Sequence, residues 1–257
     1  MHNSLTIFTS AKTERLLYVL DWIFTECLQI NYTIASGPAR DDKDTIAVGY
    51  GVLIPGGINI PSSGLLEESG IRTQDIATGS WENIPTLYAA EQNEYSIPFD
   101  IFSAVFFLVS RYEEYYQYTP DKHGRYPATE SILYNNKWLE RPLVDEWLSA
   151  FRELLVKKFN MEVAGFRFSY LPTYDIDIAW SYKHKGGLRN AGGLVKNLLA
   201  LQPAIAAERL QVLSGVHTDP FDSFSFLKNL HTAHHYKPVY FILAALNTGP
   251  FDKNIHP

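Results

Sequence analysis

Two apolar segments with helical patterns between them constrain the fold of the C-terminal part of this chain. Residues 166–180, FRFSYLPTYDIDIAW, predict a strand followed by a loop. Residues 237–246, KPVYFILAAL, form a continuous apolar run, which is typical of a strand covered on both faces. The stretches 185–201 and 221–236 between them show helical spacing. Strands joined by helices in this way predict a parallel α/β unit.

The first 160 residues follow a different pattern, in which helices and short strands alternate with turn-rich loops. The patterns change between Asn160 and Gly165, so we expect two domains, residues 1–160 and 165–257. The segment 111–131 is dense in aromatic and charged residues, and we expect it to be an ordered, hydrogen-bonded connection rather than a binding surface. The elements expected before the boundary are helices at 11–29 (with Ser10 as N-cap), from Pro98 onward and at 142–159, and strands at 45–54 (a strand and hairpin region), 58–61 and 82–88.

Composition excludes several classes of function. The 257 residues carry a net charge of −6, so no basic excess favours nucleic acid as a partner. No stretch resembles a signal peptide, and no apolar run approaches the roughly 20 residues that a membrane helix needs. We therefore expect a cytoplasmic protein with no membrane partner. The single cysteine, Cys27, excludes a disulfide framework and a cysteine-rich zinc site, and its helical context predicts a core thiol.

Two acids one residue apart, Asp175 and Asp177, stand at the end of the strand predicted in 166–180. Residues at i and i+2 of a strand point to one face, so the two carboxylates can converge. A divalent cation would relieve their repulsion, or one acid would bind metal while the other handles a proton. The alternative is that one acid caps a helix and the other lies in a surface turn.

The residues around these acids resemble the opening of a polysaccharide deacetylase, the NodB homology domain. Thr173, Asp175 and Asp177 match the family's Thr-x-Asp-x-Asp variant, and KPVYFIL resembles its second strand. Residues 1–160 resemble an accessory domain of unknown function that precedes such deacetylases in Bacteroidetes-like proteins. The segments that carry this second resemblance are RYEEY, DKHGRY and RPLVDEW.

The resemblance implies an α/β fold in which an accessory α/β domain is followed by the first β/α units of a (β/α)7-type barrel. It also implies hydrolysis of N-acetyl groups on a glycan, with a divalent metal, zinc, as cofactor. Asp175 would be the catalytic base, and Asp177 would bind the metal together with two histidines. A later histidine would protonate the leaving amine.

The histidines of this chain do not match the family's metal ligands. His231 and His235 share a helical i, i+4 spacing, but they precede the second strand rather than follow the third, which predicts an ordinary surface or helix-end cluster. His256 follows the second strand too closely, and His184 and His217 have no identifying spacing. We therefore expect the ligands beyond residue 257, a truncated chain that is inactive alone, and exposed apolar strand edges.

Two other functions fit the same sequence. A glycosyltransferase could use an Asp-x-Asp motif to hold Mn²⁺ or Mg²⁺ against a nucleotide sugar, because these ions prefer oxygen ligands. Alternatively, the aromatic-rich first domain could be a non-catalytic module that binds a glycan or a protein.

Overall fold

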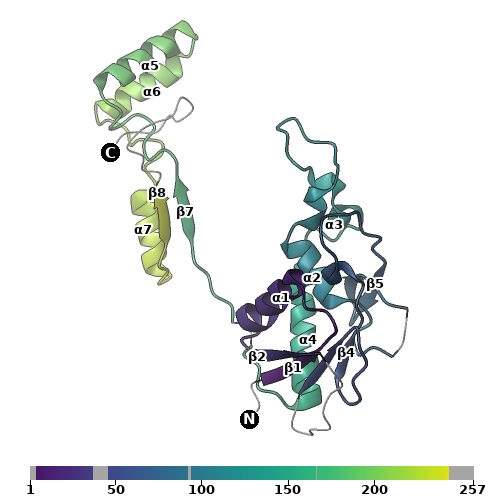
Figure 1. Ribbon diagram of the computed structural model, residues 1–257. Helices are drawn as coiled ribbons and strands as arrows, with labels where there is room; N and C mark the ends of the chain where they lie inside the picture. The colour runs from purple at the N-terminus through teal and green to yellow at the C-terminus, as the bar shows by residue number, and fades with distance from the viewer. Residues whose placement is uncertain (1–3, 37–45, 92–93, 166, 243–257) are drawn as a thin grey trace. The chain divides into compact units, whose positions relative to one another are not determined.

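The computed structural model describes residues 4–36, 46–91, 94–165 and 167–242. The chain divides into two compact units, the first ending at Gly165 (Figure 1). Both units mix helices and strands, so the fold is α/β. Within the described ranges, every helix is too short or too polar to traverse a lipid bilayer.

The first unit is built on a four-stranded parallel sheet in the order β2-β1-β3-β4 (Figure 1). The strands β1 and β2 were not predicted, although the alternation in SLTIF and NYTIA is typical of half-buried strands. The strands are β1 (Ser4–Phe8), β2 (Asn31–Ala35), β3 (Ala47–Tyr50) and β4 (Ile58–Ile60).

The hairpin expected at 45–54 is wrong for the described residues, because β3 pairs with β4 in parallel. The chain turns back after β3, but the segment 51–57 folds over the strand without pairing to it. The Asn59 side chain holds this segment, accepting from the Ile54 N–H at 2.8 Å and donating to its carbonyl at 3.2 Å. Gly49 permits the close approach, because a Cβ there would lie 2.3 Å from the Val52 carbonyl oxygen.

Three helices cover the hydrophobic core of the first unit. The helix expected at 11–29 begins three residues later than predicted, at α1 (Glu14–Leu20), and its N-cap is Thr13 rather than Ser10. It continues as a π-helix, Asp21–Cys27, and ends two residues before the predicted end. The helix α2 begins at Ile101, three residues after Pro98. The helix α4 (Leu143–Phe159) confirms the prediction at 142–159. The side chains that meet in this core include Leu16, Phe24, Val48, Phe102, Trp147 and Phe151.

Asp100 caps α2 (Ile101–Val109) from a position that is 1% exposed. One carboxylate oxygen accepts the Ser103 N–H at 2.9 Å, and the other accepts the Ser63 N–H at 2.7 Å and the Tyr50 hydroxyl at 3.1 Å. Burial raises the pKa of Asp100, and the donors from Ser103 and Ser63 oppose that rise. The cap thereby joins α2 to β3 and to the loop after β4.

The remaining elements of the first unit are short. The segment 111–131 is ordered by hydrogen bonds, as predicted: Glu113 accepts the Ile132 N–H at 3.0 Å, and Asp121 accepts the N–H groups of His123 and Arg125. The elements are the antiparallel pair β5 (Thr78–Trp81) and β6 (Ile84–Leu87), the helix α3 (Ile132–Asn135), and three single-turn 3-10 helices, Leu65–Glu67, Tyr112–Tyr115 and Ala128–Glu130. Cys27 lies half-buried against the core, and burial raises the pKa of its thiol.

The second unit contains a parallel pair of strands, as the strand–helix–strand pattern predicted. The helix α6 was not predicted, although Pro203 at its first turn is a common start signal. All four residues of β8 are exposed, so the expected coverage of this strand on both faces is wrong for the residues described; 243–246 lie outside them. The elements are β7 (Thr173–Ile176), α5 (Gly187–Leu199), α6 (Pro203–Leu213), α7 (Phe224–Ala233) and β8 (Val239–Ile242).

Candidate functional site

Asp175 and Asp177 lie at the carboxyl end of β7. Asp175 is inside the strand and Asp177 is the first residue beyond it. Both side chains are exposed, whereas Tyr174 and Ile176, which alternate with them, are half-buried. The sequence places two acids in an apolar strand without a burial penalty because they occupy its solvent-facing side.

The two acids line one pocket, with a volume of 680 Å³. Other lining residues come from the loop before α7 and from the start of that helix, including Phe221, Ser223 and Phe224. In open α/β sheets, ligands bind beyond the carboxyl ends of the strands. This pocket runs along β7 and extends past its carboxyl end as far as Ala179. The N-terminus of α7 carries no side-chain cap at Ser223, so its first N–H groups favour negative charge nearby.

Neither carboxylate has a hydrogen bond or an ion pair with another residue in the described part of the chain. Within that part of the chain, nothing competes with a ligand for either carboxylate. Across those same residues, however, no group of three or more His, Cys, Asp or Glu side chains could hold a metal ion. Asp175 and Asp177 alone therefore do not make up the expected zinc site. His256 falls outside the described residues.

His231 has a structural role that the sequence did not reveal. It is 5% exposed, and its Nε2 lies 2.8 Å from the hydroxyl of Tyr174, the residue between Thr173 and Asp175. Tyr174 in turn stacks on Tyr240 of β8, with ring centroids 5.3 Å apart. Through Tyr174, the bond to His231 and the stacking on Tyr240 together hold α7 against both strands. The prediction that His231 belongs to a surface cluster is wrong, because this side chain is buried.

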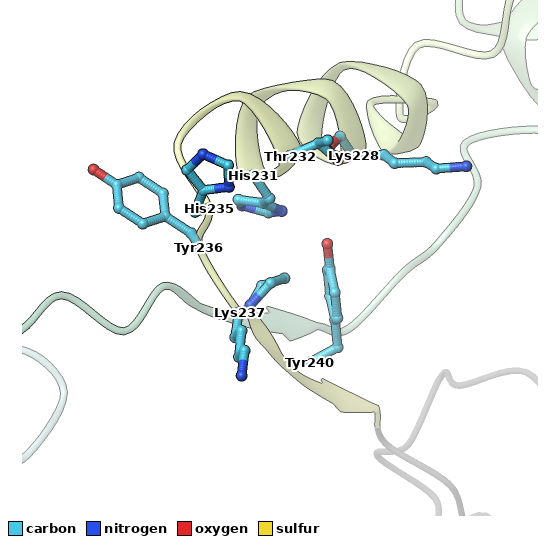
Figure 2. Close-up of a pocket in the computed structure, with 8 residues that line it drawn as sticks. Lys228, His231, Thr232, His235, Tyr236, Lys237 and Tyr240 are labelled. Carbon is cyan, nitrogen blue, oxygen red and sulfur yellow. The ribbon is translucent and has the colours of Figure 1, made fainter.

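His231 and His235 do not form a shared metal-binding face. The helix α7 ends at Ala233, and His235 lies beyond it with φ of 56°. Both histidines line a second pocket, with a volume of 520 Å³. Figure 2 shows that the side chains of Lys228 and Lys237 point away from the His231 ring there. Because the two lysine side chains do not converge on His231, this pocket is a weaker candidate for a functional site than the one beside Asp175.

Asp219 fixes the wall of the Asp175 pocket. It is 2% exposed and accepts N–H groups from Ser181, Tyr182, Lys183 and Phe221 at 2.8 to 3.1 Å. Burial alone would raise its pKa, but these four donors outweigh it and lower the pKa to about 2. The loop after β7 is thereby tied to the loop before α7. The Asp-Pro pair at 219–220, typical of a turn, was the signal that could have indicated this residue.

Comparison with known proteins assigns the first unit to a family but gives no activity. A family model described as "Family of unknown function (DUF7033)" matches residues 5–160. No curated protein and no solved structure matches the chain. The matched region ends before β7, so it does not include the Asp175 pocket.

Proposed function

The chain belongs to the family of unknown function DUF7033, and we propose that the residues after its matched region form part of a metal-dependent polysaccharide deacetylase. The observation that carries this proposal is the pairing of Asp175 and Asp177 in one pocket at the carboxyl end of a parallel strand. The motif Thr-x-Asp-x-Asp, which resembles that of NodB-type deacetylases, lies at this position.

In the proposed fold, β7 and β8 are the first two strands of a (β/α)7-type barrel, and DUF7033 is its accessory domain. The parallel register from Thr173–Val239 to Ile176–Ile242 supports this arrangement, as do the helices between the strands. The active sites of β/α barrels collect at the carboxyl ends of their strands, which is where the two acids lie.

The two acids would have separate roles. Asp175 would accept a proton from the water that attacks the acetyl carbonyl of an N-acetylated sugar. Asp177 would be one ligand of a divalent metal, zinc in our proposal, whose other ligands come from outside the described residues. Neither carboxylate has a partner among the described residues, which supports both roles, because neither group must leave a contact with those residues.

The test uses the protein made from its complete natural gene. Zinc content and release of acetate from tetra-N-acetylchitotetraose are measured for the wild type and three variants. We expect Asp177→Ala to lose zinc and activity, and Asp175→Asn to keep zinc while losing about 100-fold or more in rate. Asp222→Asn is the matched control, since Asp222 lies beside the pocket wall without lining it.

Retention of zinc and full acetate release by Asp177→Ala would refute the proposal. Binding of a UDP-sugar that depends on Mn²⁺ and on Asp177 would indicate a glycosyltransferase instead.

A further inference from the structure

A pocket of 290 Å³ in the first unit lies beside the segment 111–131. Its walls come from the 3-10 helix Tyr112–Tyr115, the residues that follow it, and α3. Hydrogen bonds fix two of its lining residues in place. Glu113 is bonded to the start of α3, and the Tyr116 hydroxyl accepts the Gln74 N–H at 3.1 Å.

Three tyrosines line this pocket, Tyr116, Tyr118 and Tyr126, together with the apolar residues Ile76, Phe107 and Ile132. The rings of Tyr118 and Tyr126 meet at 79° with centroids 5.0 Å apart, and both residues are half-buried. An edge-to-face contact of this kind favours one relative orientation of the two rings. Rigid aromatic faces bind ligands at a low entropic cost because little side-chain freedom is lost.

Polar side chains without a partner among the described residues line the same pocket. The side chains of Gln117, Glu130 and Asn135 line the pocket and make no hydrogen bond or ion pair with the described residues. One oxygen of Glu113 is bonded to the Ile132 N–H, whereas the other has no partner among those residues. The amides can donate to and accept from hydroxyl groups of a ligand, and the carboxylates can accept from them.

The electrostatics of the pocket favour a ligand without negative charge. Glu113 and Glu130 line it, and none of its lining residues is Lys, Arg or His. Burial is the main cause that raises the pKa of Tyr126 to about 12, and Glu113 and Glu130 contribute next. The two carboxylates therefore act electrostatically on the Tyr126 hydroxyl. An anionic ligand at the same place would be repelled by them.

We propose that this pocket binds one sugar ring of a glycan that carries no acidic groups. The tyrosine rings would stack on the apolar face of the ring, and the amides and carboxylates would bond its hydroxyls. The inference does not rest on the hydrolase activity proposed above, because the pocket lies in the unit matched by DUF7033 and away from the Asp175 motif in sequence. Either proposal can fail without the other.

Binding is measured by calorimetry on the full chain with three probes: tetra-N-acetylchitotetraose, its fully de-N-acetylated form and tetragalacturonate. We expect the first two to bind and the acidic oligomer not to bind. Tyr118→Ala should weaken binding about tenfold through loss of stacking and buried area. Gln117→Ala should weaken it about threefold to tenfold, and it leaves the fold intact because Gln117 is exposed.

The matched control is Tyr115→Ala, because Tyr115 is 67% exposed in the same segment and does not line the pocket. Its affinity for the probes should equal that of the wild type. The proposal is overturned if neither neutral nor amine-bearing oligomer binds, if tetragalacturonate binds as tightly, or if Tyr115→Ala and Gln117→Ala have equal effects.

Discussion

Asp219 illustrates how one carboxylate can organise two loops of the second unit. Its two oxygens accept from four backbone N–H groups, three of them in the loop that follows β7. Charge-assisted hydrogen bonds are stronger than neutral ones, and buried N–H groups left without acceptors are costly. This single side chain therefore fixes the loop whose residues Pro220 and Phe221 line the pocket together with Asp175 and Asp177.

Replacing Asp219 with Asn should destabilise the second unit by about 2 kcal/mol, since an amide donor would face backbone donors. Urea unfolding monitored within 167–242 measures the change. Asp222→Asn is the control, because the Asp222 side chain makes no hydrogen bond or ion pair with the described residues. This variant should unfold like the wild type. Equal midpoints for the two variants would show that the Asp219 bonds contribute nothing.

The same residue predicts a pH dependence. The pKa of Asp219 is about 2 in the folded chain against an ordinary value of 3.8, so its contribution is fully present above pH 4 to 5. That contribution is lost as the pH falls through 2, and the gap between the two pKa values corresponds to on the order of 2 kcal/mol. The stability difference between wild type and Asp219→Asn should therefore shrink from pH 5 to pH 2; a constant difference would contradict the lowered pKa.

At the scale of elements, α5 offers a direct test of how packing overrides helix propensity. It contains two adjacent glycines, Gly192 and Gly193, in its interior. A Cβ on Gly192 meets nothing within 4 Å, whereas a Cβ on Gly193 would lie 2.7 Å from the guanidinium of Arg209. That guanidinium donates to Asn190 and Asn197 and lies over the ring of Tyr182, so it does not move freely.

We expect Gly192→Ala to stabilise the second unit by about 0.5–1 kcal/mol through lower unfolded-state entropy. Gly193→Ala should gain nothing or lose stability, because Arg209 must leave its partners. Thermal unfolding by circular dichroism at 222 nm compares the two. Equal gains would mean that Arg209 does not hold α5 against α6.

For the whole molecule, the two units differ in how much apolar surface they bury. The main core cluster lies entirely between Leu5 and Val163. Among the described residues of the second unit, only Tyr182, Ala206 and Val212 are buried hydrophobic side chains. Since buried apolar contacts set the free energy of local opening, the units should differ in stability.

Hydrogen exchange measured by mass spectrometry tests this difference. We expect amides of α4 to exchange at least about 100-fold more slowly than amides of α7. Peptides from β3 serve as an internal reference, because Val48 at its centre is fully buried. Similar protection in α4 and α7 would show that the apolar residues of the second unit are covered in solution.

The sequence by itself determined the elements whose signals are local. The helix α4 could be predicted almost to the residue, because its apolar spacing, its leading proline and its terminal lysines all lie within one segment. The parallel pairing of β7 with β8 followed from the helices between them. The α/β class of both units rested on such patterns.

Only the tertiary structure decided what depends on residues far apart in the chain. The parallel course of β3 and β4 follows from the loop that Asn59 folds back over β3, and no local pattern distinguishes that loop from a hairpin. The hydrogen bond between Tyr174 and His231 joins residues 57 positions apart in the sequence. This bond turns the His231 side of α7 toward the strands, so His231 is buried whereas Phe226 is 67% exposed. Periodicity reports which residues can share a face, but the neighbour that covers the face is fixed by packing between distant segments.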